Sequence, residues 1–365
     1  PQYVRFRTYF VLKLIRRGGN GHESLFFDVT SLELGTTRIG DSVMITRQSI
    51  LAGLVLAFFG IDSAWAEPTA AYSRREDVVY GRKDGMALTM DVLTPTANPN
   101  GAAVIWVVSG GYYSSHDAIH PLFVATLLSR GYTVFAVVHG SQPRYTIPDA
   151  VADLNRAVRF IRYHAQKYRI DPNRVGITGG SAGGHLSVMQ GVAGDLGDPK
   201  AKDPVDRTSS RVQAVACFFP PTDFLNYGKP GNVALGTGIL KGFPAPFEFR
   251  EYDAKKKTLV RITDEKRMLE IGRQISPVNH VSRDDPPIRI IHGDADTLVP
   301  IQQAESLIEK LKAAGVPADL VVKKGAGHGW VTLPLDMTTI ADWFDKYLTD
   351  EAVRKNGRKT LDLGR

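Results

Sequence analysis

The sequence has a single cysteine and no histidine pattern typical of a metal site. One cysteine among 365 residues excludes an intramolecular disulfide and a zinc site built from several cysteines. Cys217 lies within the apolar run 212–219, so we expect a small buried side chain there. The nine histidines form no H-E-x-x-H or other recognisable ligand cluster, so the sequence implies neither a metal nor another cofactor.

The sequence also lacks a basic stripe. Its net charge of +7 is concentrated in residues 1–49 and 351–365, and the body between them is nearly neutral. No basic stretch interleaved with aromatic residues occurs in that body, so we expect no nucleic-acid partner. The run Lys255, Lys256 and Lys257 is interpreted as a solvated helix face or loop.

One apolar run near the N-terminus, residues 50–61, is shorter than the ~20 residues that span a bilayer. Arg47 precedes it, and the small residues of Ala64-Trp65-Ala66 follow it. Residues 44–66 are therefore predicted to be a secretory signal peptide, which implies a secreted or periplasmic protein with no membrane span in its mature form. A buried helix of the fold is the alternative.

Residues 1–43 lack a starting methionine and show no steady apolar period. We hypothesise that they are translated upstream sequence outside the native protein. Residues 67–365 then form one large domain, for which the 43% hydrophobic content is sufficient.

Short runs rich in valine and isoleucine alternate with helical patterns along the chain. The predicted parallel strands are residues 102–108, 132–138, 175–178, 212–218, 288–291 and 320–323, an outer antiparallel strand is residues 87–93, and helices are residues 149–168, 307–311 and 340–348. This alternation predicts a mostly parallel sheet with helices on both sides. Asp153 and Arg156 are interpreted as a pair on one face of the helix at 149–168.

The sequence Gly179-Gly180-Ser181-Ala182-Gly183 follows one of these strands and begins a helical stretch, which is the setting of a nucleophile elbow. The sharp turn leaves little room for side chains two residues either side of the serine, and it exposes the serine hydroxyl. The alternative is a glycine-rich turn with Ser181 as a helix N-cap.

Two later strands end in a histidine- and aspartate-rich loop, residues 292–300, and in a glycine-rich loop around His328. The resulting chain order, Ser181, Asp296, His328, is that of a hydrolase with a nucleophile elbow. Asp294 competes with Asp296 for the acidic position. His185 lies one turn after the elbow serine and is interpreted as a packing or supporting residue.

From about Tyr72 to about Leu348 the chain resembles α/β-hydrolases of the esterase and lipase type, nearest to the hormone-sensitive-lipase-like and carbohydrate-esterase-like (acetylxylan and feruloyl esterase) branches. The resemblance rests on Ser109-Gly110-Gly111-Tyr112, residues 153–162, the elbow at 181–186, and His292-Gly293-Asp294-Ala295-Asp296. It implies the α/β-hydrolase fold, a mostly parallel central sheet flanked by helices. The aromatic, Gly- and Pro-rich residues from about 222 to 275 are then a cap insertion over the active site.

The resemblance also implies a role for each candidate residue. Ser181 attacks a carbonyl, His328 takes and returns the proton, and Asp296 orients the imidazole. The backbone N–H groups of Ala182, Gly111 and Tyr112 form the oxyanion hole, although Ser109 stands where relatives with an H-G-G-G or H-G-G-Y loop carry histidine. The side chains that line the substrate pocket are expected to be Tyr112, Tyr113 and Trp330.

These residues and the resemblance lead us to expect a carboxylic-ester hydrolase. The carbohydrate-esterase resemblance and the predicted export imply a short acyl ester, or an acetyl or feruloyl ester of plant polysaccharide, as its substrate. An amidase or peptidase with the same residues is the alternative, followed by a silent binding protein on the same scaffold. The substrate partner is thus a small-molecule or polysaccharide-linked ester, and the sequence does not indicate an oligomeric state.

The signal-peptide hypothesis predicts the N-terminus of the exported protein. Intact-mass and N-terminal peptide analysis by mass spectrometry should find a chain that begins near Glu67, because the small residues before it fit a cleavage site. A secreted product that retains Pro1 would contradict both this prediction and the hypothesis about residues 1–43.

Overall fold

The computed structural model describes residues 13–17, 24–28 and 72–349. The chain divides into two compact units, residues 1–62 and 63–365. In the first unit, β1 (Lys13–Arg17) pairs antiparallel with β2 (Ser24–Asp28). The predicted signal peptide, residues 44–66, and most of residues 1–43 lie outside the described residues.

The second unit is built on an eight-stranded sheet in the order β12-β11-β8-β7-β5-β6-β4-β3. Strand β4 runs antiparallel to both of its neighbours, and the other pairings are parallel. The strands are β3 (Tyr72–Lys83), β4 (Met86–Pro95), β5 (Ala103–Val108), β6 (Thr133–Val138), β7 (Val175–Thr178), β8 (Ala214–Phe218), β11 (Ile288–Gly293) and β12 (Ala318–Lys323). The seven predicted strands are confirmed. The predicted antiparallel strand, β4, is not at the edge of the sheet, because β3 pairs with its outer side.

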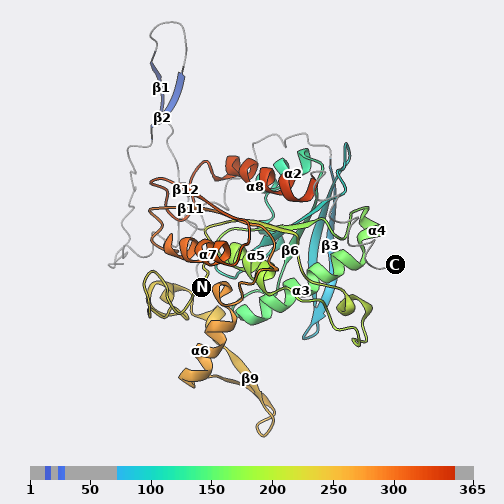
Figure 1. The fold of residues 1–365 in the computed structure, drawn as a ribbon, viewed down its shortest axis with the longest axis vertical. Helices are drawn as coiled ribbons and strands as arrows, with labels where there is room; N and C mark the ends of the chain where they lie inside the picture. The colour runs from blue at the N-terminus through green and yellow to red at the C-terminus, as the bar shows by residue number, and fades with distance from the viewer. Residues whose placement is uncertain (1–12, 18–23, 29–71, 350–365) are drawn as a thin grey trace, which may run out of the picture. The chain divides into compact units, whose positions relative to one another are not determined.

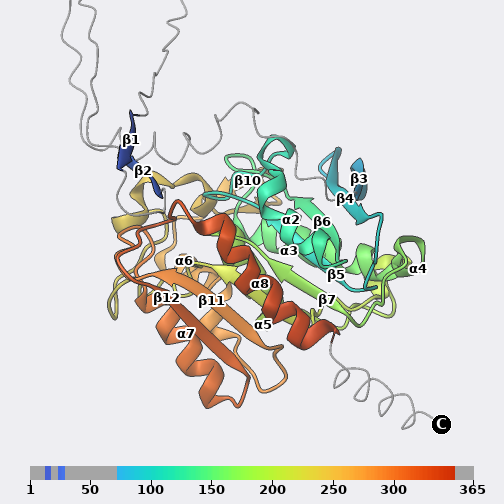
Figure 2. The same ribbon diagram turned by 90° about the horizontal axis from the view of Figure 1, so that it is seen from above.

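Helices cover both faces of the sheet (Figures 1 and 2). One face carries α2 (Ala125–Ser129) and α8 (Met337–Phe344), and the other carries α3 (Ile147–Tyr163), α5 (Ala182–Ala193) and α7 (Gln302–Ala313). Side chains of the fully buried strand β5 alternate between the two cores: Ala103, Ile105 and Val107 enter one, and Val104, Trp106 and Val108 enter the other. This two-sided burial explains why the strand is apolar throughout.

The helix predicted at residues 149–168 is two helices. A capping box between Thr146 and Asp149 starts α3 at Ile147, and α4 (Ala165–Tyr168) follows after His164. The shorter helical turns are η1 (His116–Ala118), η2 (Pro121–Phe123), η3 (Pro204–Arg207), η6 (Pro277–Asn279), η7 (Leu333–Asp336) and the π-helical η8 (Asp345–Thr349). None of the helices in the described part of the chain is both long and apolar enough to cross a membrane.

The interpretation of Asp153 and Arg156 as a pair is wrong. Asp153 is buried and pairs with Lys83 at 3.0 Å, whereas Arg156 pairs with Asp203 at 2.7 Å and Asp206 at 2.8 Å. All three partners come from segments distant in sequence, and a helical repeat alone carries no information about them.

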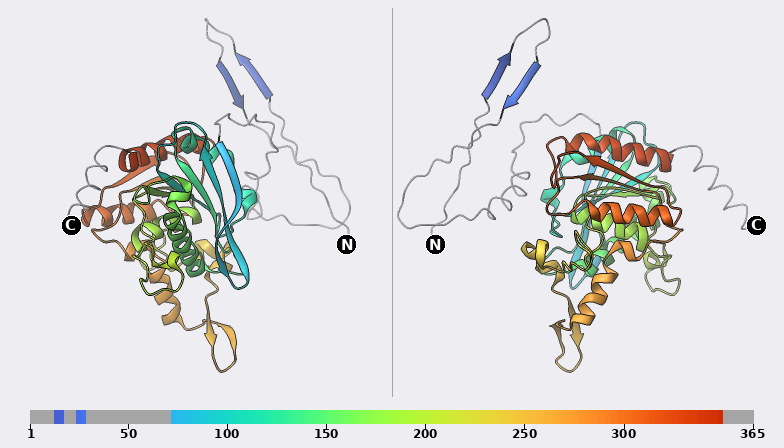
Figure 3. Two further views of the ribbon diagram at one scale, coloured as in Figure 1. Left: turned by 90° about the vertical axis from the view of Figure 1, so that its right-hand side faces the viewer. Right: turned by 60° about the vertical axis from the view of Figure 1, so that its left-hand side comes forward.

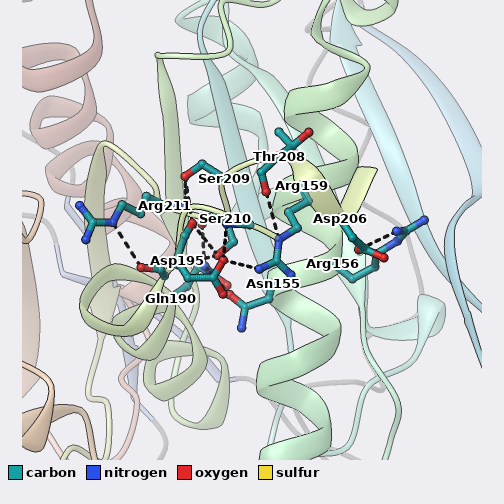
Figure 4. A network of polar contacts seen from close by, with 12 residues as sticks. Asn155, Arg156, Arg159, Gln190, Asp195, Asp206, Thr208, Ser209, Ser210 and Arg211 are labelled. Atoms are coloured by element: carbon teal, nitrogen blue, oxygen red, sulfur yellow. Dashed lines mark hydrogen bonds and ion pairs between the residues drawn. The ribbon is translucent and has the colours of Figure 1, made fainter. Parts of the chain in front are cut away.

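Arg156 belongs to a polar network that fastens residues 194–213 to α3 and α5 (Figure 4). Arg159 bonds Asp195 and the Thr208 carbonyl, and Gln190 of α5 bonds the Ser210 carbonyl at 2.7 Å. The network holds α5, the helix that begins at the elbow, against α3.

The segment predicted as a cap, residues 222–275, forms short elements between β8 and β11. They are η4 (Gly238–Gly242), η5 (Ala245–Phe247), β9 (Arg250–Asp253), β10 (Thr258–Arg261) and α6 (Glu265–Gln274). The β9–β10 hairpin and α6 project from the body (Figures 1 and 3). Lys255, Lys256 and Lys257 are exposed in the hairpin turn, so they lie in a loop and not on a helix.

Candidate active site

The turn between β7 and α5 forms the elbow that the sequence predicts. Ser181 has φ 54° and ψ −119°, a strained conformation for a residue with a side chain. A Cβ atom on Gly179 would lie 2.6 Å from the backbone carbon of Gly183, and one on Gly183 would lie 2.7 Å from the Val107 carbonyl oxygen. The turn is therefore too tight for a side chain at either glycine.

Ser181, His328 and Asp296 form one hydrogen-bonded chain. The Ser181 Oγ lies 2.9 Å from His328 Nε2, and His328 Nδ1 lies 2.7 Å from Asp296 Oδ2. Because the aspartate accepts, Nδ1 carries the proton, and Nε2 accepts from the serine hydroxyl. The three residues follow β7, β11 and β12, whose carboxyl ends lie at one edge of the parallel sheet.

Asp296 is held as a buried carboxylate. Its Oδ1 accepts the N–H groups of Leu298 and Val299, each at 2.9 Å. Burial alone would raise its pKa, but hydrogen bonds from His292, His328 and Val299 together with the charge of His328 hold the pKa well below the usual range. The competing Asp294 is exposed and accepts the Gly325 N–H at 2.6 Å, so it has no contact with the imidazole of His328.

The aromatic residues beside His328 fix its ring. Phe219 lies 4.6 Å from the imidazole, centroid to centroid, and also contacts Trp330 at 5.7 Å. The Trp330 Nε1–H donates to Asp336 at 2.6 Å, and Lys323 pairs with the same carboxylate at 2.9 Å. Trp330 therefore has a fixed position near His328.

The loop after β5 is a tight turn whose tip faces the elbow. Gly110 and Tyr113 exchange backbone hydrogen bonds at 3.0 and 2.9 Å, and Gly111 and Tyr112 between them have φ values of 54° and 65°. This turn leaves the N–H groups of Gly111 and Tyr112 outside its own hydrogen bonds. Ala182 is the first residue of α5, so its N–H has no acceptor within the helix.

The three side chains expected to line the pocket lie in different environments. Tyr113 is 57% exposed and Trp330 is half-buried, so both are accessible. Tyr112 is buried, with its ring edge-on to His185 at 5.6 Å and to Phe247 at 6.3 Å. The Tyr112 hydroxyl has no hydrogen-bond partner among the described residues.

His185 is a packing residue, as interpreted from its position one turn along α5. It is fully buried, and its Nε2 bonds the Ile275 carbonyl at 2.7 Å at the end of the cap segment. Phe243, also from the cap segment, lies against the loop after β5, because a Cβ on Gly111 would be 2.8 Å from its ring. The cap segment thus contacts both the elbow helix and the loop after β5.

Sequence reasoning missed several residues of this site. His292 is buried, donates from Nε2 to the Val299 carbonyl at 2.8 Å and lies 3.4 Å from Asp296. Its position four residues before Asp296 was the available signal. Nothing local marks Phe219, Phe243 or His139, which reach the site only through the fold.

A second hydroxyl, imidazole and carboxylate meet elsewhere in the fold. His116 lies 2.7 Å from Thr89 Oγ1 and 2.9 Å from Asp91 Oδ1. Asp91 is also bonded by Arg74 at 2.6 Å, and Asp77 lies 3.3 Å from the other imidazole nitrogen. The carboxylate is already neutralised by the guanidinium, so we assign this contact to holding η1 against β4.

The eight-stranded sheet, the strained elbow and the residues at the carboxyl ends of β7, β11 and β12 define an α/β-hydrolase fold. The BD-FAE family model matches residues 90–311, which is more than half of the chain. The chain therefore belongs to the BD-FAE family.

Named relatives of this chain are esterases. The probable carboxylic ester hydrolase LipM of Mycobacterium tuberculosis is 30% identical over 66% of this chain and 52% of LipM. Esterase LipC of the same organism is 27% identical over 86% of this chain and 78% of LipC. The isoprenylcysteine alpha-carbonyl methylesterase ICME of Arabidopsis thaliana is 25% identical over 70% of this chain and 56% of ICME. The match with LipM thus spans about half of that protein.

Solved structures of esterases share the fold. A truncated carbohydrate esterase from gut microbiota superposes with a TM-score of 0.63 and 26% identity, covering 78% of this chain and 100% of that one. A bifunctional GH43-CE protein of Bacteroides eggerthii gives 0.60 and 26%, covering 75% of this chain and 38% of that one.

The elbow geometry predicts different outcomes at two adjacent glycines. Gly179→Ala should lower the free energy of unfolding by more than about 2 kcal/mol, because the new methyl group meets the Gly183 backbone. Gly180→Ala is the matched control, since its Cβ would find ordinary contact at 3.6 Å, and it should stay within about 1 kcal/mol of the wild type. Urea unfolding of both variants is the measurement. Equal losses would contradict the steric explanation.

Two buried histidines predict a pH dependence of stability. Burial lowers the pKa of His139 and of His185 to about 4, against hydrogen bonds to Gly140 and Ile275 that act in the opposite direction. Between about pH 6.5 and 4 the unfolded chain binds protons that the folded protein excludes. The free energy of unfolding should therefore fall on acidification, by up to about 1.4 kcal/mol per pH unit for each histidine. Urea unfolding across this window should show a shallower slope for His139→Gln, and parallel curves would contradict the assignment to His139.

Proposed function

We propose that this protein is a carboxylic-ester hydrolase that works through an acyl-enzyme intermediate on Ser181. The hydrogen-bonded chain from Ser181 through His328 to Asp296 is the observation that carries the proposal. Membership of the BD-FAE family and the esterase names of LipM and LipC support the same activity.

The proposed reaction begins when Ser181 Oγ attacks the ester carbonyl carbon and its proton passes to His328 Nε2. The resulting imidazolium is stabilised by the ionised Asp296, whose pKa lies below the usual range. The bond to the alcohol then breaks, and the alkoxide takes the proton from Nε2. Water repeats these steps on the acyl-enzyme and releases the acid.

Negative charge on the carbonyl oxygen needs donors that already point toward it. We assign this role to the backbone N–H groups of Ala182, Gly111 and Tyr112. The turn at residues 110–113 does not use the N–H groups of Gly111 and Tyr112 in its own hydrogen bonds. Ala182 begins a helix whose N-terminal end favours negative charge.

For the substrate we propose a short acyl ester, or an acetyl or feruloyl ester on plant polysaccharide. The 26% identity with a carbohydrate esterase from gut microbiota supports the second choice. Tyr113 and Trp330 are accessible, Trp330 contacts the Phe219 ring that lies against His328, and both are assigned to substrate contact. Export through a signal peptide at residues 44–66, to a secreted or periplasmic location, would bring the protein to such a polymer.

The proposed activity predicts hydrolysis of p-nitrophenyl acetate and butyrate, of acetylated xylan or of feruloyl esters, in preference to a peptide anilide. Ser181→Ala should lower kcat by about 10⁴-fold or more, because the nucleophile is lost. Equal or greater activity on the anilide would favour an amidase or peptidase. A wild-type protein that binds these compounds without turnover would favour a silent scaffold.

Two aspartates of the same loop distinguish the loss of the carboxylate that bonds His328 from a general disturbance of the loop. Asp296→Asn should lower kcat by about 10³–10⁴-fold, since the neutral amide no longer supports the imidazolium. Asp294→Asn removes only the charge of an exposed loop side chain, whose amide oxygen still accepts the Gly325 N–H, and it should keep kcat within about threefold of the wild type. Steady-state kinetics of both variants are the measurement, and similar losses would contradict the assignment.

A further inference from the structure

The loop that carries Gly111 and Tyr112 is bonded to a buried histidine from another strand. His139 directly follows β6, is 3% exposed, and places Nε2 2.8 Å from Ser109 Oγ. Its Nδ1 lies 2.8 Å from the Gly140 carbonyl oxygen, which only accepts hydrogen bonds. Nδ1 therefore carries the proton, Nε2 is the acceptor, and the Ser109 hydroxyl donates to it.

The surroundings keep this imidazole neutral and in that tautomer. Burial lowers the pKa of His139 to about 4, and the nearby positive charge of Lys83 acts in the same direction. Lys83 is paired with Asp153 at 3.0 Å, and Asp153 accepts the Gly140 N–H at 2.9 Å. Gly140, whose carbonyl accepts the hydrogen bond from Nδ1, is thus itself fixed to α3 through its N–H.

His139 also holds the other end of the loop. Its backbone N–H donates to Ser114 Oγ at 3.1 Å, and the Ser114 hydroxyl donates to the Val108 carbonyl at 2.5 Å. One residue therefore bonds Ser109 through its side chain and Ser114 through its backbone. The tip, with its two positive φ values, lies between these two points.

The same loop contacts the elbow. The Ser109 carbonyl accepts the Gly183 N–H at 3.3 Å, one residue after Ala182. A shift of Ser109 would therefore change the distance between the N–H of Ala182 and the N–H groups of Gly111 and Tyr112. These are the donors assigned above to one oxyanion.

We propose that His139 is a positioning residue for the esterase reaction, which holds both ends of loop 109–114 and so keeps the N–H groups of Gly111 and Tyr112 aimed at the oxyanion. This inference rests on the proposed function. In this chain the imidazole comes from the residue after β6, while Ser109 occupies the loop position where the resemblance stated above implies a histidine. The contact between Ser109 and His139 is a fixed part of the oxyanion hole's support, although neither residue touches the substrate.

The test compares kcat and KM of four single variants on p-nitrophenyl acetate. Ser109→Ala and His139→Asn each remove the contact, and kcat should fall about 10- to 100-fold with KM within about threefold, because misplaced donors affect the transition state more than the bound ester. His139→Gln should recover most of kcat, because the amide of glutamine can occupy the position of Nε2 and bond the Ser109 hydroxyl. The shorter asparagine side chain places its amide at the position of Nδ1 and does not reach Ser109. Ser115→Ala, at the residue that follows the loop and whose side chain bonds only the Asp117 N–H, should match the wild type.

A double variant measures whether the two residues act together. Ser109→Ala combined with His139→Asn should be no slower than the slower single variant, because both changes remove one interaction. Fully multiplicative losses, or equal losses for His139→Gln and His139→Asn, would overturn the proposal. The small Ser109→Ala change keeps the test informative if a His139 variant does not fold.

Nitrogen NMR of the wild-type imidazole gives a readout that is independent of turnover. It should show protonated Nδ1 and unprotonated Nε2 for His139 at pH 7, and the opposite tautomer would overturn the proposal. If the wild type neither hydrolyses the ester nor forms an adduct at Ser181 with a fluorophosphonate, the proposed function fails. If the wild type is active and Ser109→Ala equals it in kcat, only the role of His139 fails.

Discussion

The close approach of β7 and α5 is the constraint on which the site depends. Gly179 and Gly183 nearly touch through their backbones, and this contact forces the chain to turn at Ser181 with a positive φ. The strain persists because β7 is fully buried between two neighbouring strands and because α5 is tied to α3 and to residues 194–213. Packing energy from both sides of the sheet thus keeps one hydroxyl at the surface in a conformation that an isolated peptide would not adopt.

Buried titratable groups of this fold are stabilised in opposite protonation states. Asp296 is buried yet ionised, because several N–H donors and an imidazole offset the cost of its burial. His139 and His185 are buried and neutral, because each ring has a single backbone carbonyl that accepts a hydrogen bond from it and pairs with no carboxylate. The protonation state of each buried group is therefore set by its hydrogen-bond partners and neighbouring charges as well as by its burial.

Much of this architecture could be predicted from sequence because its signals are local. Buried parallel strands are continuous apolar runs, and the elbow is marked by Gly179 and Gly183, where a Cβ would clash with backbone atoms. Strand β3 was missed because most of its side chains are exposed and polar, and the β9–β10 hairpin because it packs on little else. The partners of Asp153, Arg156 and Ser109 were missed because they lie 30 to 70 residues away, at places that only the folded sheet brings together.

The bond between Ser109 and His139 has a consequence for sequence divergence. The imidazole of His139 is buried and its Nε2 accepts the Ser109 hydroxyl, so replacing Ser109 alone leaves a buried ring nitrogen without its hydrogen-bond partner. The residues at positions 109 and 139 should therefore covary among homologous proteins. A homologue with a different residue at position 109 should also carry a different residue at position 139, after β6.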